Sequence, residues 1–235
     1  MTRPRVLLVE DDPSIRRFVV LALEDLDIEL LEAASLAEAR QQLARGPLQL
    51  LISDLMLPDG SGATLLQELA ADPVRRAGAR LVAFSAGINA DKRAQLLALG
   101  VDEVLAKPVS LPALEECVHR ALAGGVPAPA AVAAPLSVVE QYFAGDQALY
   151  AAYRASCLAQ FAQDRRQGDQ AVAAGDLAAL RRLAHSLKSV LLPLGHNEAG
   201  RQAAALELAA EGADLEGASA GWARLRAELE ELPPE

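Results

Sequence analysis

The sequence predicts an α/β domain with a doubly wound five-stranded parallel sheet, followed by an all-α four-helix bundle. In the first half, short apolar runs alternate with amphipathic stretches, which is the pattern of successive strand–helix units. From Ser137 onward the strand signals end, and apolar residues recur at helical spacing. A stretch with three prolines separates the two patterns.

The strands predicted in the first half are short, and several are apolar on both faces, as buried parallel strands require. They are Arg5–Glu10, Ile28–Ala33, Leu48–Ser53, Arg80–Phe84 and Val101–Leu105. Helices are expected between them, at Pro13–Asp25, Leu36–Ala44, Gly62–Ala71, Ala90–Leu99 and Leu111–Leu122. Because ligands of such a sheet bind at the carboxyl ends of the strands, polar residues at those ends are candidates for a site.

The second half predicts an antiparallel bundle of four long helices joined by short connections. The candidate helices, four of them long and two short, are Val138–Phe143, Ala148–Gln167, Gln170–Ala174, Leu177–Leu192, Glu198–Glu211 and Ala218–Glu231. Glycines separate them, at Gly168, Gly175, Gly195 and Gly212. The expected organisation is therefore an α/β domain over residues 1–123, a Pro/Ala-rich linker over 124–136 and a helical domain over 137–235.

The charge of the chain argues against a nucleic-acid partner. The formal net charge is −10, and residues 1–123 hold 13 Lys and Arg against 18 Asp and Glu. The remainder holds 9 against 14, so neither half has the basic excess of a nucleic-acid binder. No apolar run reaches the ~20 residues of a membrane span, and the N-terminus does not resemble a signal peptide. We therefore expect a cytoplasmic protein without a membrane partner.

Carboxylates gather at the ends of two predicted strands. Glu10, Asp11 and Asp12 end the first strand, and Asp54 follows the third. Clustered carboxylates repel one another, and oxygen ligands in an open site suit Mg²⁺. A carboxylate beside Mg²⁺ can act as a nucleophile toward phosphorus. Asp12 also has a structural interpretation, because it or Ser14 can cap the helix that begins at Pro13.

Two further polar residues end the fourth and fifth strands. Lys107 can supply a positive charge to phosphoryl oxygens, and Ser85 can donate a hydroxyl hydrogen bond to one of them. The peptide bond between Lys107 and Pro108 is a candidate for the cis form. Any one of these residues alone is without meaning, but their joint placement at strand ends indicates a phosphate-accepting site.

These residues carry a resemblance to a known family. The segments Val-Leu-Leu-Val-Glu-Asp-Asp-Pro-Ser-Ile-Arg-Arg, Ser-Asp-Leu-Met-Leu-Pro-Asp-Gly-Ser-Gly and Ala-Lys-Pro resemble the receiver domain of bacterial response regulators, a flavodoxin-like fold. The resemblance covers about residues 4–123. It implies Asp54 as phosphoacceptor, and Glu10, Asp11, Asp54 and the Met56 carbonyl as Mg²⁺ ligands, with Glu10 acting mainly through water. It also implies Ser85 as switch hydroxyl and Lys107 as phosphate-binding lysine.

One position departs from the pattern of that family. Receivers often carry an aromatic switch residue three positions before the lysine, and this chain has Val104 there. The departure puts the aromatic rotamer switch in doubt, but it leaves the residues for phosphorylation in place.

One helix of the second half carries a candidate nucleophile. Asp176 is its expected N-cap, and its core stripe is Leu180, Leu183, Leu187, Val190 and Leu194. His185 and Lys188 are three residues apart on the other side, so they are neighbours. An exposed neutral imidazole is a competent nucleophile, and Lys188 can offset the charge of a phosphoryl group. An isolated histidine would more simply be a surface residue.

The motif Ala-His-Ser-Leu-Lys-Ser, followed by Leu-Gly, resembles the histidine phosphotransfer (HPt) domain over about residues 137–232. The resemblance implies His185 as the phosphorylated residue and Lys188 as a phosphate-stabilising residue. Many members of that family have Gly where Ser189 stands, and serine is still small.

The two resemblances together imply a phosphorelay protein that moves phosphoryl groups between Asp54 and His185, within the chain or in trans. Its expected partners are a histidine kinase or hybrid kinase and other receiver or HPt domains. The sequence has no glycine-rich ATP-binding motif, so a phosphotransfer protein is expected rather than a kinase, with self-dephosphorylation implied by the family. The alternative is a phosphorylation-switched receiver whose helical half is a protein-binding output module.

Overall fold

The computed structural model describes residues 3–123 and 137–232. The chain forms two compact units, Met1–Gly145 and Asp146–Glu235. The predicted linker, residues 124–136, lies outside the described residues. The predicted boundary at residue 137 stays a prediction.

The first unit is built on a five-stranded parallel sheet, as predicted. Its strand order is β2-β1-β3-β6-β7. The strands are β1 (Arg5–Val9), β2 (Glu29–Ala33), β3 (Leu50–Asp54), β6 (Arg80–Ala86) and β7 (Glu103–Lys107). The observed strands β3, β6 and β7 end one or two residues later than the sequence pattern predicts, so Asp54 and Lys107 belong to the strand ends themselves.

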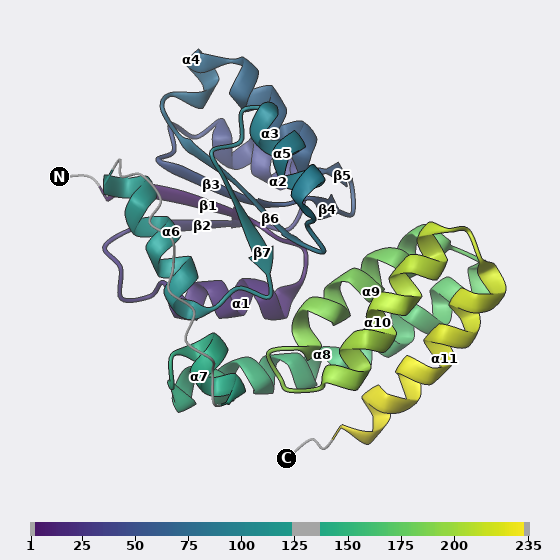
Figure 1. Cartoon of the computed structure of the whole chain (residues 1–235). Coiled ribbons are helices and arrows are strands. Elements are labelled where there is room, and N and C mark those ends of the chain that lie inside the picture. The colour runs from purple at the N-terminus through teal and green to yellow at the C-terminus, as the bar shows by residue number, and fades with distance from the viewer. Residues whose placement is uncertain (1–2, 124–136, 233–235) are drawn as a thin grey trace. The chain divides into compact units, whose positions relative to one another are not determined.

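Helices cover both faces of this sheet (Figure 1). They are α1 (Pro13–Ala22), α2 (Leu36–Leu43), α3 (Gly62–Ala71), α4 (Pro73–Arg76), α5 (Ala90–Ala98) and α6 (Leu111–Ala123). Helices α1 and α6 lie on one face, and α2, α3 and α5 lie on the other (Figure 1). Alternate strand residues such as Leu7, Leu51 and Leu81 are buried under the second group. The period of two along each strand therefore fills both faces with aliphatic side chains.

Three short elements were not predicted from the sequence. They are the two-residue strands β4 (Met56–Leu57) and β5 (Gly60–Ser61), which pair antiparallel, and the four-residue helix α4. Elements this short have too few residues to produce a periodic apolar pattern.

Helix α7 (Val138–Phe143) belongs to the first unit by its packing. Its Phe143 is buried, and the ring lies edge-on to that of Phe18 in α1, with the centroids 5.7 Å apart. Ser137 caps the helix by accepting a hydrogen bond from the Glu140 amide. The sequence pattern groups this helix with the helical half, whereas its observed contacts group it with the sheet.

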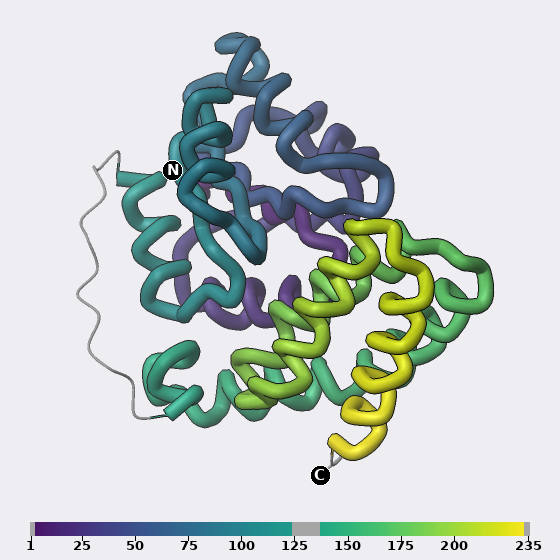
Figure 2. Tube along the Cα trace, turned by 45° about the vertical axis from the view of Figure 1, so that its right-hand side comes forward, coloured from purple at the N-terminus to yellow at the C-terminus, as the bar shows by residue number. Residues whose placement is uncertain are grey.

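The second unit consists of four long helices that lie alongside one another (Figure 2). They are α8 (Gln147–Ala174), α9 (Leu177–Leu191), α10 (Asn197–Glu211) and α11 (Leu215–Glu231). The predicted helical bundle is therefore confirmed.

The predicted break at Gly168 is wrong, because α8 continues through this residue. A Cβ atom on Gly168 would lie 2.1 Å from Cζ2 of Trp222 in α11. The glycine therefore makes room for an indole ring on the neighbouring helix, and it does not end its own helix. The Trp222 indole N–H donates to Asp169 at 2.9 Å and fixes the ring beside this position.

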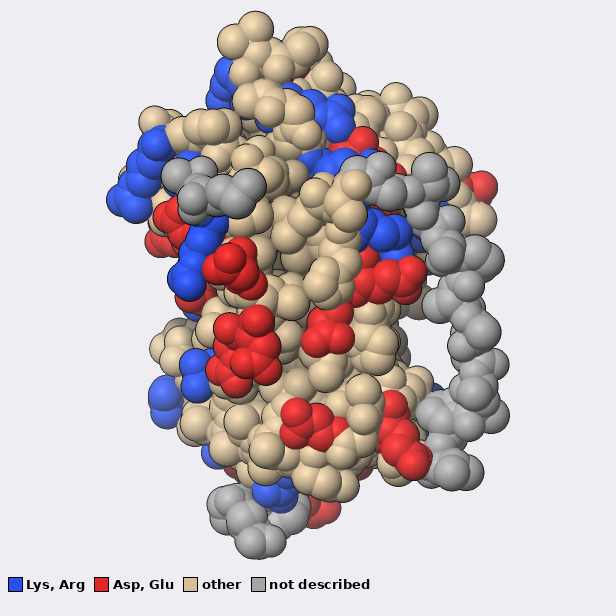
Figure 3. All heavy atoms as spheres, turned by 90° about the vertical axis from the view of Figure 1, so that its left-hand side faces the viewer, with Lys and Arg blue, Asp and Glu red and all other residues tan. Residues whose placement is uncertain are grey.

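No helix in the described part of the chain has the length and apolarity to cross a bilayer. Acidic and basic side chains are interspersed on the face that Figure 3 shows.

Candidate functional site

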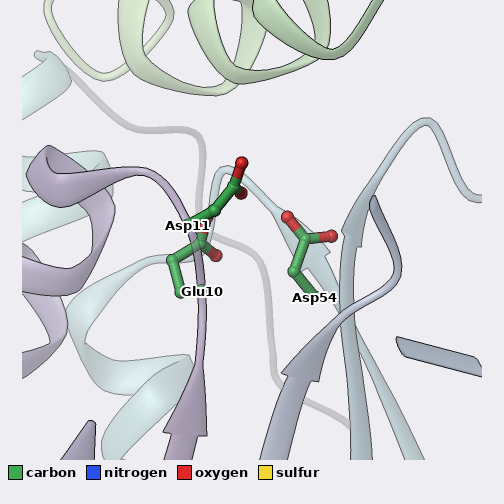
Figure 4. A group of neighbouring side chains, drawn as sticks. All are labelled: Glu10, Asp11 and Asp54. Atoms are coloured by element: carbon green, nitrogen blue, oxygen red, sulfur yellow. The ribbon is translucent and has the colours of Figure 1, made fainter. Parts of the chain in front are cut away.

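The predicted acidic residues of the first unit meet at the carboxyl end of the sheet. Strands β1 and β3 are neighbours, and their register pairs Val9 with Ser53, so Glu10 and Asp54 follow at the same level. Glu10, Asp11 and Asp54 each offer a carboxylate oxygen within 4.8 Å of the others. Figure 4 shows the carboxylate groups of these three residues gathered at this edge.

Lys107 reaches into the acidic cluster from β7. Its Nζ lies 2.5 Å from a carboxylate oxygen of Glu10 and 2.6 Å from a carboxylate oxygen of Asp54. All three side chains are at most 3% exposed. The ammonium also lies 4.7 Å from the centroid of the Phe84 ring. The peptide bond between Lys107 and Pro108 is cis, as expected from the sequence.

Burial dominates the electrostatics of the carboxylates. It raises the pKa of Glu10 well above its usual value, and the nearby Lys107 only partly opposes this. Burial likewise raises the pKa of Asp11 to about 6, with a further contribution from the charge of Asp54. For Lys107, burial would lower the pKa, but the two carboxylates outweigh it and raise the pKa. One lysine therefore does not neutralise the cluster, and a cation would be favoured there.

The carboxylate of Asp54 is held by backbone amides. Its Oδ1 accepts hydrogen bonds from the amides of Leu55 at 2.5 Å and Met56 at 3.1 Å. Its other oxygen contacts Lys107. The two carboxylate oxygens therefore have distinct partners, and the side chain has a fixed orientation.

Gly62 supports this arrangement and was not singled out from the sequence. A Cβ atom there would lie 1.7 Å from the Asp54 carbonyl oxygen, so α3 begins against the backbone of β3 only because this residue is glycine. The signal in the sequence is the Gly-Ser-Gly run, which is otherwise a common turn pattern.

Ser85 is the penultimate residue of β6, the strand next to β7. The register pairs Ala86 with Lys107 and Ser85 with Ala106. The hydroxyl of Ser85 is buried and donates to the Ala86 carbonyl at 3.4 Å. Val104 is buried in the core between the sheet and α2, α3 and α5. The site thus has its hydroxyl on the neighbouring strand, and Val104, the position that departs from the receiver pattern, belongs to the core.

The donor set at this edge fits a small divalent cation. The donors are carboxylate oxygens, and Mg²⁺ prefers oxygen ligands. Desolvated carboxylates with raised pKa values are destabilised as anions, and a bound cation would relieve that cost.

Asp12 caps α1 and was one of the two candidates for that role. Its Oδ1 accepts hydrogen bonds from the amides of Ser14 at 2.8 Å and Ile15 at 3.0 Å. The third carboxylate of the Glu-Asp-Asp run is therefore engaged in capping.

The predicted nucleophile of the second unit lies on α9. Asp176 caps this helix by accepting from the Ala179 amide at 2.9 Å, and the predicted core stripe is buried. His185 Nδ1 lies 2.7 Å from a carboxylate oxygen of Glu207 in α10. Lys188 contacts the other oxygen of the same carboxylate. One glutamate therefore joins the histidine and the lysine.

Glu207 was not identified from the sequence. Burial would raise its pKa, but the hydrogen bonds from His185 and Lys188 outweigh burial and lower the pKa to about 2. An ionised carboxylate on Nδ1 favours the tautomer with its proton on that nitrogen, which leaves a lone pair on Nε2. Glu207 is one of many glutamates in a helical stretch, so only the packing of α10 against α9 distinguishes it.

The His185 side chain is 6% exposed, in contrast to the exposed imidazole that the helical pattern predicts. Its Nε2 has no hydrogen-bond partner among the described residues. The pattern of α9 places the histidine on the polar side, but it does not reveal the neighbouring side chains. Ser189 is also buried, and its hydroxyl donates to the His185 carbonyl at 3.1 Å.

Comparisons with family models divide the chain in the same way. Residues 6–119 match the model of the response regulator receiver domain, and residues 152–233 match the model of the Hpt domain. Helix α7 lies between the two matched ranges.

Several curated proteins are similar to part of the chain. The response regulator protein PilR of Pseudomonas aeruginosa is 35% identical over 122 residues, which are 52% of this chain and 27% of that protein. The aerobic respiration control sensor protein ArcB of Escherichia coli is 31% identical, over 47% of this chain and 16% of that protein. The KDP operon transcriptional regulatory protein KdpE of Escherichia coli is 36% identical, over half of each chain. The chain thus spans at most about half the length of these relatives.

Solved structures also align with about half of the chain. A CheY-like receiver domain protein from Methanospirillum hungatei is 25% identical with a TM-score of 0.48, over 52% of this chain and 96% of that chain. The chemotaxis response regulator CheY4 of Vibrio cholerae is 24% identical with a TM-score of 0.46, over 51% and 99%.

Proposed function

This chain carries a response regulator receiver domain followed by an Hpt domain, and from that premise we propose that it is a phosphorelay protein that moves phosphoryl groups between Asp54 and His185. Two separate sites support this proposal: a fixed, buried aspartate beside Lys107 and a histidine with one ring nitrogen held by Glu207. The proposed partners are a histidine kinase or hybrid kinase and the receiver or Hpt domains of other proteins, in the cytoplasm.

In the proposed reaction at the first site, an oxygen of Asp54 attacks the phosphorus of a phosphohistidine. The new P–O bond forms as the P–N bond breaks, and the leaving imidazole takes up a proton. Lys107 would exchange part of its contact with Asp54 for the phosphoryl oxygens, and Ser85 would turn its hydroxyl toward one of them. Mg²⁺, held by Glu10, Asp11, Asp54 and the Met56 carbonyl, would offset the negative charge of the transferred group. In self-dephosphorylation, water would attack the same phosphorus, the P–O bond to Asp54 would break, and the carboxylate and inorganic phosphate would be released.

At the second site, the Nε2 lone pair of His185 would accept the phosphoryl group from a phosphoaspartate, with the carboxylate as leaving group. Glu207 would hold the Nδ1 proton and stabilise the positive ring, while Lys188 would turn toward the phosphoryl oxygens. The Nε2 atom that would accept the group has no hydrogen-bond partner among the described residues.

The experiment that tests this proposal labels the full chain with a radioactive small phosphodonor and Mg²⁺. We expect base-labile label on Asp54 and acid-labile, base-stable label on His185. Asp54→Asn should abolish both, and His185→Gln should abolish only the second. His196→Gln is the matched control, because His196 lies in the same unit but outside the contact with Glu207.

The second candidate function is a receiver that switches a protein-binding output module. It predicts phosphoaspartate without any base-stable label, both with the chain alone and with a phosphorylated partner receiver. Base-stable label that survives His185→Gln would contradict the assignment of the histidine.

A further inference from the structure

Arg16 connects the first helix to the turn that carries the acidic residues. It lies on α1, and its side chain folds back along the chain. Its Nη1 donates to the carbonyl oxygens of Glu10 at 2.5 Å and Asp11 at 2.8 Å. The side chain is 21% exposed, and its Nε lies 4.0 Å from a Glu32 oxygen. One guanidinium therefore binds two consecutive peptide groups.

Those two peptide groups set the direction of the Asp11 side chain. The carboxylate of Asp11 receives no hydrogen bond from a side chain in the described ranges; its pKa responds to burial and to the charges of Asp54, Lys107 and Asp12. Its carboxylate nevertheless lies at the same edge as those of Glu10 and Asp54 (Figure 4). The position of this carboxylate therefore depends on the backbone that Arg16 holds.

Arg16 has two opposing effects on a cation bound at the acidic cluster. A guanidinium near the carboxylates repels a second cation, so by charge alone it would weaken Mg²⁺ binding. Its two hydrogen bonds act in the opposite direction, because they restrict a turn whose carboxylates would otherwise separate by repulsion. The two effects predict opposite signs when Arg16 is replaced.

We propose that Arg16 is a positioning residue for the phosphorylation site: it fixes the Glu10–Asp11 backbone so that the Asp11 carboxylate stays directed at the cation. This inference rests on the proposed function, in which the acidic cluster binds Mg²⁺. Arg16 touches none of the reacting atoms.

The test is a calorimetric Mg²⁺ titration of the full chain and its variants. Replacement of Arg16→Gln should weaken Mg²⁺ binding by about ten-fold, which is the lower end of the effect of removing an outer-shell partner. Arg16→Lys keeps the charge but loses the two-pronged geometry, so part of that loss should remain. Arg17→Gln is the matched control: it removes the same charge from an exposed neighbour and should leave binding unchanged or slightly tighter.

A second measurement separates positioning from general damage. In phosphorylation by a small phosphodonor, Arg16→Gln should need more Mg²⁺ for half-maximal rate but reach the wild-type rate at saturating Mg²⁺. A reduced plateau, or unchanged or tighter Mg²⁺ binding by Arg16→Gln, would overturn the inference while the proposed function stands. Absence of Mg²⁺ binding by the wild type would instead overturn the proposed function and this inference with it. If Arg16→Gln does not fold by circular dichroism, the same criteria apply to Arg16→Lys.

Discussion

The two candidate sites differ in how many carboxylates contact their lysine. Lys107 faces the two buried carboxylates of Glu10 and Asp54, so one ammonium group is shared by two carboxylates. Lys188 shares the single carboxylate of Glu207 with His185, and the side chains of Lys188 and Glu207 are 17% and 15% exposed. The first site therefore offers carboxylate oxygens to a further cation, whereas at the second site one carboxylate contacts both a lysine and an imidazole. Under the proposed function, we expect phosphorylation of Asp54 to depend on Mg²⁺ more strongly than phosphorylation of His185.

The largest expected effect is that of Lys107→Met. Its removal leaves two carboxylates buried without their cation, so the first unit should lose about 3–5 kcal/mol of stability at neutral pH. Hydrogen exchange of β1 and β3 in the full chain measures this loss, with Lys92→Met on the exposed side of α5 as control. Added Mg²⁺ should restore part of the stability. A loss of stability no larger than that of the control would contradict the difference between the two sites.

Glu207→Gln should destabilise the second unit at pH 7 by roughly 2–3 kcal/mol, because the pKa of the native carboxyl is lowered from its usual 4.5 to about 2. A lowered pKa stabilises the fold above the unfolded pKa and loses this contribution as the pH falls toward about 2. The difference between wild type and variant should therefore shrink below pH 4.5. Fluorescence of Trp222, the single tryptophan, follows urea unfolding of this unit.

The matched control for that variant is Glu211→Gln. Glu211 lies on the same helix as Glu207, and its exposed carboxylate pairs with Arg181 of α9. Its effect should be small and nearly independent of pH. A Glu207→Gln penalty that is equally large at pH 3 and pH 7 would show that packing, and not the ionised carboxylate, accounts for it.

Gly168→Ala tests how much the close packing of α8 against Trp222 contributes to the stability of the second unit. The added Cβ would lie 2.1 Å from the Trp222 ring, so the variant should lose about 1–3 kcal/mol and change the tryptophan fluorescence. Thermal unfolding followed by that fluorescence measures the change. Gly212→Ala, whose Cβ would meet nothing closer than 3.4 Å, is the control and should be nearly neutral.

The smallest expected effect is that of Lys188→Met. The pair of Lys188 with Glu207 is partly exposed, so its loss should cost at most about 1 kcal/mol of stability in the same fluorescence assay. The loss of stability for Lys107→Met should therefore be several times the loss for Lys188→Met. Equal losses at the two lysines would contradict it.

Much of the fold could be predicted from the sequence because its signals are local. The strand runs, the capping residues Asp12 and Asp176 and the apolar stripe of α9 are each visible within a few consecutive residues. The errors lie where a distant residue decides. The sequence predicts a helix break at Gly168, because the Trp222 ring that occupies the space beside it is distant in the chain. The packing of Phe143 in α7 on Phe18 likewise joins residues too far apart in the sequence for a local pattern to predict.

The sequence by itself determined the fold class of each half and the residue types of both sites, because periodicity and motif spacing are properties of the chain. Only the tertiary structure revealed which groups hold those residues in place. Glu207 binds His185 across two helices, and Arg16 fixes the backbone of the acidic turn. The physical reason is that hydrogen bonds and burial depend on distances between atoms, and the distances that join separate helices exist only after the chain has folded.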